Sequence, residues 1–394
     1  MTYRHIKYTH YSEVPPNSKI CIYGVGQGGT LTYEMLTSLR PDLNIAAFAD
    51  TYKTGVFQNI PILSPEELSN YNSSFDLILI CSSYATEIRD ILEENQITNY
   101  FFFSWPRLHS CQFLPEELQH AQNKIQRIVE HLHSQNDKDL FLDLVEFRSI
   151  NSKIASIYTG TENQPIINLN DSEFLNNKYP KHTSARYFDF TLLETVQNVV
   201  QGGVCNGREA VFIIQNCPQL VRIFGFEAFG TSLLDKKHSE ILLNSDKFFP
   251  INKGLWESSG QFIFSTLGEI INDSKSITEG TSVKVCSLDN ESAKLGLDRL
   301  DLLFCDIENS ELPMLKGAIN LIKKSRTQLA ISFYHSKHQF LDIPLFLIDN
   351  LENYIFKVGH YEPHIGDSVF YAIPKEVYSG HQKYLESAIQ ILDS

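Results

Sequence analysis

The same order of segments occurs twice in this chain: an apolar segment, a glycine-rich turn, a helical pattern and a second apolar segment that ends in an acid. The first copy runs from residues 18–24 (SKICIYG) through a turn at 24–29 to Asp50, and the second from residues 198–201 through a turn at 202–207 to Glu227. Glycines let the backbone turn sharply and approach a ligand closely, and a helix N-terminus offers free N–H groups. The acid one strand over can accept hydrogen bonds from ribose hydroxyls. The repeated order therefore predicts two open α/β folds of nucleotide-binding type.

The two turns differ in spacing. The first fits the pattern G-x-G-x-x-G, and its acid follows the last glycine by 21 residues, so the predicted site consists of Gly24, Gly26, Gly29 and Asp50. The second, Gly202-Gly203-Val204-Cys205-Asn206-Gly207, lacks the dinucleotide spacing, although its acid follows after 20 residues. That turn suits a ligand with a nucleoside and a non-phosphate tail, such as S-adenosylmethionine, at least as well as NAD. For each turn, a tight bend that binds nothing is the alternative.

Further apolar segments complete two α/β units. They lie at residues 75–82 and 99–103 in the first half, and at 282–288, 302–307 and 329–334 in the second. Strands that alternate with helical patterns predict parallel sheets covered on both faces, and residues 355–361 and 368–373 predict a terminal antiparallel pair. Residues 115–147 have a helical pattern. Residues 150–182 are polar and form either a cap over a site or a surface excursion, and residues 376–392 predict a last helix. We therefore expect an α/β chain with two Rossmann-like three-layer domains (1–110 and 186–394) joined by a helical connector and polar loop region (111–185).

An acidic cluster follows the strand at residues 302–307. Asp306 and Glu308 are two residues apart, so they share a face at the carboxyl end of the strand, where open α/β sheets bind ligands. Either acid could position or deprotonate a substrate hydroxyl, and His335, at the end of the strand 329–334, is a candidate acid or base. Glu311 begins the next helix, where an acid suits the helix dipole. A divalent metal held by Asp306, Glu308 and His335 is an alternative that the spacing does not select, and we expect no metal.

Charge and cysteine usage exclude several classes of protein. Lys plus Arg number 33 and Asp plus Glu 47, which gives a formal charge of −14 and disfavours nucleic acid and anionic membranes as partners. We expect the seven scattered cysteines to be reduced and buried, because no C-x-x-C pair occurs. No apolar run approaches the ~18 residues of a membrane helix, so we expect a cytoplasmic protein.

Residues 187–374 resemble the FkbM-type methyltransferases, which use S-adenosylmethionine. The blocks that carry the resemblance occur in the family's order: residues 187–189 (YFD), 202–207 (GGVCNG), 224–228 (FGFEA), 287–289 (SLD), 306–311 (DIENSE), 315–318 (LKGA), 333–335 (FYH) and 359–361 (GHY). The second half is then expected to have a class I methyltransferase-like fold. Residues 18–104 are similar, more loosely, to small Rossmann-like domains fused to sugar-modifying enzymes.

The resemblance implies O-methylation of a sugar or glycan precursor. In that role the cofactor would lie against Gly202, Gly203, Asn206 and Gly207, with Glu227 on the ribose, and Asp306, Glu308 and His335 at the methyl centre. Two residues depart from the family: Gln201 replaces an acid before the glycine pair, and Asn309 replaces a glycine after Glu308. The alternatives are a non-catalytic nucleotide or nucleotide-sugar binding module with a degenerate methyltransferase domain, and an NAD-dependent oxidoreductase. The methyl acceptor and the oligomeric state stay open.

Overall fold

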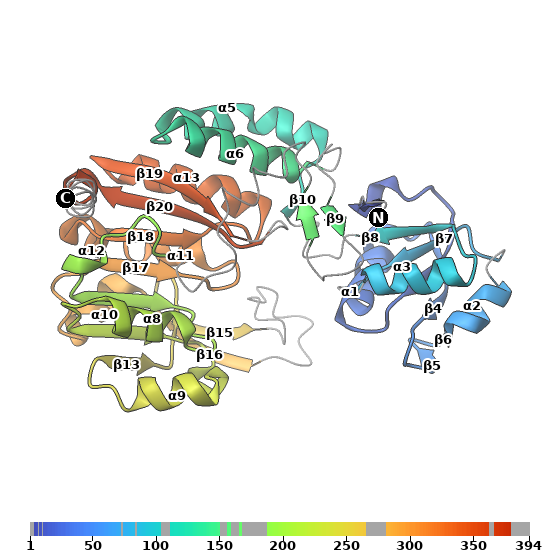
Figure 1. The fold of residues 1–394 in the computed structure, drawn as a ribbon, viewed down its shortest axis with the longest axis horizontal. Helices are drawn as coiled ribbons and strands as arrows, with labels where there is room; N and C mark the ends of the chain where they lie inside the picture. The colour runs from blue at the N-terminus through green and yellow to red at the C-terminus, as the bar shows by residue number, and fades with distance from the viewer. Residues whose placement is uncertain are drawn as a thin grey trace, which may run out of the picture. The chain divides into compact units, whose positions relative to one another are not determined.

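The computed structural model describes residues 4–6, 8–9, 11–71, 74–82, 85–103, 111–149, 156–158, 165–167, 187–264, 281–361 and 366–379. The chain divides into two compact units. The first consists of Met1–His120, Val145–Leu175 and Pro363–Ile365, and the second of Ala121–Leu144, Asn176–Glu362 and Gly366–Ser394. Most of the first unit is blue in Figure 1, and most of the second runs from green to red.

The first unit is built on a seven-stranded sheet in the order β2-β8-β7-β3-β4-β6-β5, parallel except for the β5–β6 pair. Its strands are β2 (Tyr8–Thr9), β3 (Lys19–Tyr23), β4 (Asn44–Ala49), β5 (Gly55–Phe57), β6 (Ile60–Leu63), β7 (Leu77–Ile80) and β8 (Tyr100–Phe103). The helical elements are η1 (Tyr11–Glu13), α1 (Gln27–Leu39), α2 (Pro65–Tyr71) and α3 (Ala85–Glu94). A separate antiparallel sheet joins β1 (Arg4–Ile6), β9 (Ser156–Tyr158) and β10 (Pro165–Ile167).

Alternation along β3 explains why the sequence of this strand is apolar throughout. Ile20 and Ile22 belong to one buried cluster, and Cys21 and Tyr23 belong to another. Successive side chains of a strand point to opposite faces of the sheet, so both faces of this sheet are covered. The predicted parallel sheet of the first half is therefore confirmed.

The second unit contains a seven-stranded sheet in the order β13-β12-β11-β17-β18-β20-β19. Its strands are β11 (Asn198–Gly202), β12 (Arg222–Phe226), β13 (Phe248–Ile251), β17 (Leu302–Cys305), β18 (Gln328–Ser332), β19 (Tyr354–His360) and β20 (Ser368–Pro374). The first five are parallel to one another, and β20 lies antiparallel between β18 and β19. Numbered along the chain, this order is 3-2-1-4-5-7-6. The predicted terminal antiparallel pair is thus confirmed, and β20 inserts beside β18.

Helices flank this sheet in the second unit (Figure 1). They are α8 (Arg208–Asn216), α9 (Lys236–Leu243), α10 (Leu288–Lys294), α11 (Glu311–Lys316), α12 (Ile319–Ser325) and α13 (Lys337–Asn350), with short turns η3 (Leu193–Thr195) and η4 (Gly230–Leu233). A small sheet joins β14 (Gly254–Leu255), β15 (Gly260–Phe264) and β16 (Thr281–Cys286). The strand expected at 282–288 is therefore present as β16, but it lies in this small sheet and ends before α10.

The helical stretch predicted at residues 115–147 forms two helices, α5 (Pro115–His131) and α6 (Gln135–Phe147). A buried ion pair of 2.9 Å joins Asp137 on α6 to Lys357 on β19, and Phe141 stacks on Phe340 of α13 with ring centroids 5.1 Å apart. Helix α6, up to Leu144, therefore packs within the second unit, to which it belongs. The predicted polar region 150–182 lies outside the described residues apart from β9 and β10, and the last predicted helix is described only up to residue 379.

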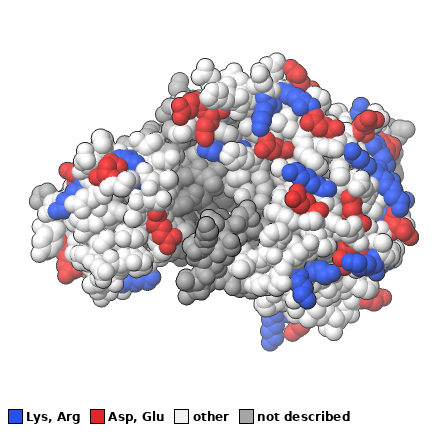
Figure 2. All heavy atoms as spheres, turned by 180° about the vertical axis from the view of Figure 1, so that it is seen from behind, with Lys and Arg blue, Asp and Glu red and all other residues white. Residues whose placement is uncertain are grey.

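The surface and the cysteines agree with the composition. Figure 2 shows basic and acidic side chains interspersed over the visible face of the second unit, so the net negative charge does not form one acidic field there. All seven cysteines are free, and each except Cys205 is buried. Among the described residues, no helix is both long and apolar enough to cross a membrane.

Candidate functional site

A cavity of about 290 Å³ opens in the second unit where β11, β12 and β17 end. Its walls include the glycines 202, 203 and 254, the aromatic residues Tyr187, Phe226, Phe229 and Phe304, and four acids: Glu209, Glu227, Asp306 and Glu308. The carboxyl ends of parallel strands meet at one edge of a sheet, which is where ligands of open α/β sheets bind. The cavity therefore lies at the position that the sequence predicted for the second glycine turn.

Two glycines of this turn let the backbones of β11 and β17 come close together. A Cβ added at Gly202 would lie 2.9 Å from Cβ of Cys305, and one at Gly203 would lie 2.0 Å from the carbonyl oxygen of Asp306. Gly203 also has a φ of +79°, in the left-handed region that favours glycine. The glycine pair thus lets residues 202–203 lie directly against Asp306, the acid that follows β17.

Asn206 and Gly207 shape the same turn without being among the residues that line the cavity. Gly207 is the N-cap of α8 with a φ of +86°, and a Cβ there would lie within 2.8 Å of Leu234 and Leu242. The side chain of Asn206 accepts a hydrogen bond from the backbone N–H of Arg208 at 3.1 Å. Of the five predicted cofactor residues in this unit, Gly202, Gly203 and Glu227 line the cavity. Asn206 and Gly207 support the turn instead.

Glu227 follows β12, and its carboxylate reaches back to the glycine turn. One oxygen accepts hydrogen bonds from the backbone N–H groups of Val204 at 3.0 Å and Cys205 at 3.1 Å, and the other accepts one from Phe229 at 3.2 Å. The carboxylate therefore fixes the shape of the turn in addition to lining the cavity.

Gln201, the last residue before the glycine pair, is only 1% exposed. Its amide nitrogen donates to the carbonyl oxygen of Gly203 at 3.0 Å. Its amide oxygen is buried and has no hydrogen-bond partner among the described residues, and Gln201 also lines the cavity. A buried acceptor without a partner is costly, so this oxygen is suited to a donor group of a bound ligand.

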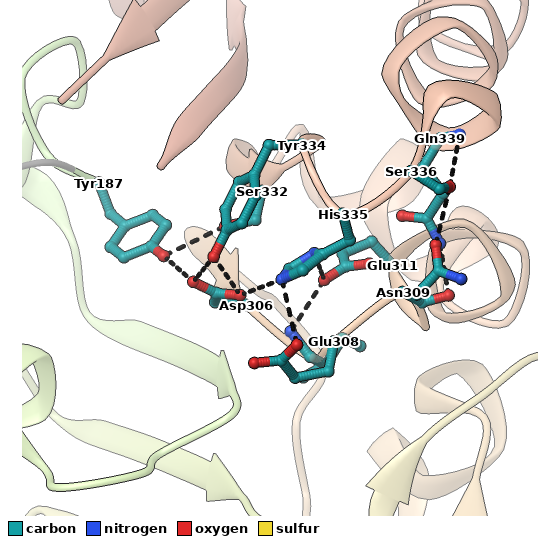
Figure 3. Close-up of polar contacts among 11 residues, drawn as sticks. Tyr187, Asp306, Glu308, Asn309, Glu311, Ser332, Tyr334, His335, Ser336 and Gln339 are labelled. Carbon is teal, nitrogen blue, oxygen red and sulfur yellow. Dashed lines mark hydrogen bonds and ion pairs between the residues drawn. The ribbon is translucent and has the colours of Figure 1, made fainter. Parts of the chain in front are cut away.

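Asp306 lies at the centre of a polar network (Figure 3). The hydroxyl of Tyr187 donates to its Oδ2 at 2.8 Å, the hydroxyl of Tyr334 donates to the same oxygen at 3.1 Å, and Nε2 of His335 lies 3.1 Å from Oδ1. Burial, together with the nearby Asp306 carboxylate, raises the pKa of Tyr334 well above its usual range, so this phenol stays a donor. The network holds the carboxylate in one orientation.

His335 follows β18 and contacts a second acid. Its Nδ1 lies 3.1 Å from Oε1 of Glu311, which is fully buried and also accepts the backbone N–H of Ile307 at 2.9 Å. Burial alone would lower the pKa of His335, but Glu311 and Asp306 together raise it well above the usual value. The structure therefore brings the three predicted catalytic residues together, since Oε2 of Glu308 lies 3.7 Å from Nε2 of the ring.

The turn that carries Glu308 keeps an unusual backbone. Glu308 and Asn309 have φ values of +52° and +75°, and the hydroxyl of Ser336 donates to the side chain of Asn309 at 2.9 Å. Asparagine tolerates the left-handed region better than most residues, so the turn is preserved where the resembled family has glycine.

The cluster also bears on metal binding. Within the part of the chain that the structure describes, donor atoms of Asp306, Glu311 and His335 lie within 4.8 Å of one another. The two ring nitrogens of His335 face different carboxylates: Nδ1 faces Glu311 and Nε2 faces Asp306. The arrangement is a histidine placed between two carboxylates.

The predicted site of the first unit has a turn of the same construction. The carboxylate of Asp50 accepts backbone N–H groups of Val25, Tyr52 and Lys53 at 2.8, 2.9 and 3.0 Å. Burial acts to raise the pKa of Asp50, but these hydrogen bonds hold it below its ordinary value. Gly24 has a φ of +109°, Gly26 is the N-cap of α1, and a Cβ at Gly29 would collide with the carbonyl oxygen of Gly24.

Sequence reasoning gave no site role to Glu209, and it assigned Glu311 to a helix N-terminus. Glu209 lies in the first turn of α8 and Glu311 in the first turn of α11, and an acid at such a position is explained by the helix dipole alone. Tyr187 and Tyr334 have no sequence signal beyond the blocks at residues 187–189 and 333–335. The signal that these residues share is burial beside a strand end, which a single sequence does not show.

The order of strands and the cavity define a methyltransferase-type α/β fold. Residues 196–358 match the family model of the methyltransferase FkbM domain, as the resemblance predicted. Residues 16–101 match the model described as C2185-like, N-terminal. No protein with a curated description matches the chain.

One solved structure supports this fold, and a second is more distant. A crystal structure of methyltransferase FkbM from Methylobacillus flagellatus is similar with a TM-score of 0.61 and 16% identity, over 91% of this chain and 90% of that one. Fibrillarin of Aeropyrum pernix in complex with S-adenosyl-L-methionine is similar with a TM-score of 0.29 and 14% identity, over 46% of this chain and 68% of that one. The first of these shows the fold, and the second is too distant to carry an argument.

Proposed function

We propose that this protein is an S-adenosylmethionine-dependent methyltransferase that methylates an oxygen of a sugar or glycan precursor. The observation that carries the proposal is the charge of the cavity wall: it includes four carboxylates, and none of the described residues in it is Lys, Arg or His. Such a wall attracts a cationic ligand and repels a pyrophosphate. S-adenosylmethionine carries a sulfonium and an ammonium group, whereas NAD carries a pyrophosphate.

The residues present fit that cofactor in three further respects. The glycine pair leaves room where a Cβ would collide with the next strand. Glu227 directly follows the second strand, β12, at the position of a ribose-binding acid. The unpartnered oxygen of Gln201 can accept a hydrogen bond from an ammonium group, although without the charge of the acid in the resembled family. When bound, the cofactor would supply an electrophilic methyl group.

The remaining chemistry falls to the acids of the cavity. Asp306 and Glu308 would flank the methyl centre and align the acceptor hydroxyl, and Asp306 would accept the proton that the acceptor oxygen loses. Methyl transfer depends on the alignment of three atoms more than on strong acid–base chemistry, so positioning supplies much of the rate. Carboxylates that accept hydrogen bonds suit the hydroxyl groups of a sugar. A role in polysaccharide biosynthesis and a cytoplasmic location are part of this proposal.

Calorimetry with S-adenosylmethionine tests the proposal. The unaltered protein should bind, and Glu227→Ala should bind at least about tenfold more weakly, a loss of about 1.4 kcal/mol, because the ribose contact and the shape of the turn are lost together. Asp50→Ala is the matched control, since it removes the corresponding acid of the other unit. Absence of binding by the unaltered protein would refute the proposal. If it binds, screening glycan precursors for a mass gain of one methyl group identifies the acceptor.

A second candidate is a nucleotide or nucleotide-sugar binding module, with the first unit as the binding part. The fixed turn at Asp50 favours it, and the neutral Gln201 is compatible with a degenerate second unit. Gly26→Arg is a clean probe, because a Cβ at Gly26 meets nothing within 4 Å. Thermal stabilisation by NAD or nucleotide-sugars only, lost in Gly26→Arg, would favour this candidate over the methyltransferase.

A further inference from the structure

His335 occupies a position that differs from that of an ordinary catalytic base. A general base presents an unprotonated nitrogen to the substrate, yet here each ring nitrogen faces a carboxylate: Nδ1 lies 3.1 Å from Glu311 and Nε2 lies 3.1 Å from Asp306. The side chain of His335 is 8% exposed, whereas that of Asp306 is 22% exposed and lines the cavity. Asp306, not the imidazole, therefore faces the cavity.

Both contacts with ionised carboxylates are attractive when each ring nitrogen carries a proton. A neutral imidazole has one N–H group and one lone pair, so one of its nitrogens would direct a lone pair at a carboxylate oxygen. With both nitrogens protonated, each contact becomes an ion pair between the imidazolium and a carboxylate. A buried histidine cation is costly, but the two carboxylates on opposite sides of the ring offset that cost.

We infer that His335 is a positioning residue: an imidazolium held between Glu311 and Asp306 that fixes the Asp306 carboxylate at the cavity and keeps it ionised. Glu311 anchors the ring, because its carboxylate is fully buried and is itself held by the backbone N–H of Ile307. The Tyr187 and Tyr334 hydroxyls orient the other oxygen of Asp306 (Figure 3).

The charges around the ring favour the cation. Three acids face it: Asp306 and Glu308 follow β17, and Glu311 lies on α11. The neighbouring ring is the neutral phenol of Tyr334, with centroids 4.1 Å apart. The pKa of His335 is raised well above its usual value by Glu311 and Asp306 against the effect of burial.

The protonation state can be measured without substrate. In the full-length chain labelled with ¹⁵N-histidine, the signals of His335 are those that disappear in His335→Gln. We expect both ring nitrogens to carry protons at neutral pH, and the titration midpoint to fall by at least about one pH unit in Glu311→Gln. A ring with one protonated nitrogen at neutral pH would overturn the inference. The inference would also be overturned if adding Mg²⁺ or Mn²⁺ removed the proton from Nε2 of His335 in the unaltered protein but not in Asp306→Asn.

The positioning role of His335 is tested by the pH dependence of cofactor binding. This test rests on the proposed function, because it uses S-adenosylmethionine. The affinity for S-adenosylmethionine should fall in acid as the carboxylates at the sulfonium are protonated, and this fall should occur about one pH unit higher in His335→Gln. The exposed His338 provides the control variant His338→Gln, whose profile should match the unaltered protein. An unchanged profile in His335→Gln, alongside weakened binding by Asp306→Asn, would refute the positioning role. If the unaltered protein binds no S-adenosylmethionine, the proposed function fails, and the ¹⁵N measurement still decides the state of His335.

Discussion

Gly203→Ala tests how closely the glycine turn and the strand β17 approach each other. The new Cβ would lie 2.0 Å from the carbonyl oxygen of Asp306, and real Cβ contacts are not shorter than 3.0 Å, so the two backbones must separate by about 1 Å. The hydrogen bond of 3.0 Å from Asp306 N to the Gly202 carbonyl resists that movement. The substitution therefore displaces the backbone of Asp306, the residue that we propose positions the acceptor.

The loss of stability expected in Gly203→Ala has two parts. Alanine in the left-handed region costs about 1–2 kcal/mol, and forcing apart a packed contact costs about 1–3 kcal/mol. The free energy of unfolding of the second unit should therefore fall by about 2–5 kcal/mol. Gly230→Ala isolates the first part, because Gly230 has a φ of +69° and a Cβ there makes an ordinary contact of 3.4 Å with Asn252. That control should lose only about 1–2 kcal/mol.

Urea unfolding measures both variants. The chain has two tryptophans, Trp105 and Trp256, so a Trp105→Phe background leaves the fluorescence of Trp256 in the second unit as the reporter. If Gly203→Ala and Gly230→Ala lose the same free energy, the close approach of the two backbones is not a constraint and the reasoning is refuted. Binding of S-adenosylmethionine should weaken in Gly203→Ala and stay unchanged in Gly230→Ala.

Three further predictions concern stability and reactivity. The hydrogen bond from Lys253 lowers the pKa of Glu291 below its ordinary 4.5. The ionised Glu291 carboxylate therefore stabilises the fold above pH 4.5, and this stabilisation is lost as the pH falls through the lowered pKa. In Glu291→Gln, acid unfolding should lack this loss of stability. Lys357→Met should cost about 3–5 kcal/mol in urea unfolding because it leaves Asp137 as a buried unpaired charge, and Asp137→Asn combined with Lys357→Met should cost less. Ellman's reagent should label a single thiol in the native protein, Cys205, and S-adenosylmethionine should slow that labelling because Cys205 lines the cavity; rapid labelling of a second thiol would contradict the buried positions of the others.

Much of the fold could be predicted because the signals are local. Apolar segments of strand length, each followed by a glycine turn and a helical pattern, specify parallel β-α units, and the structure confirms these units in both halves. The insertion of β20 beside β18 and the placement of β16 in a small sheet could not be predicted. Both depend on which strand pairs with which, and pairing partners are chosen by packing between segments distant in sequence.

The candidate site, like the fold, was predicted only in part from the sequence. Asp306 and Glu308 were predicted because they directly follow an apolar strand. The role of Glu311 was not predicted. Its position in the first turn of a helix already accounts for an acid, and only its complete burial against the His335 ring shows another purpose.

By itself, the sequence determined that this chain carries two glycine turns, each followed at a set distance by an acid, and acids at the end of the strand β17. Only the tertiary structure decided that Tyr187 and Asp306, 119 residues apart, hydrogen-bond to each other, and that Gln201 leaves a buried oxygen at the cavity. The physical reason is that local propensity fixes each strand and turn. The distances between side chains on different strands follow from how the strands pair and pack.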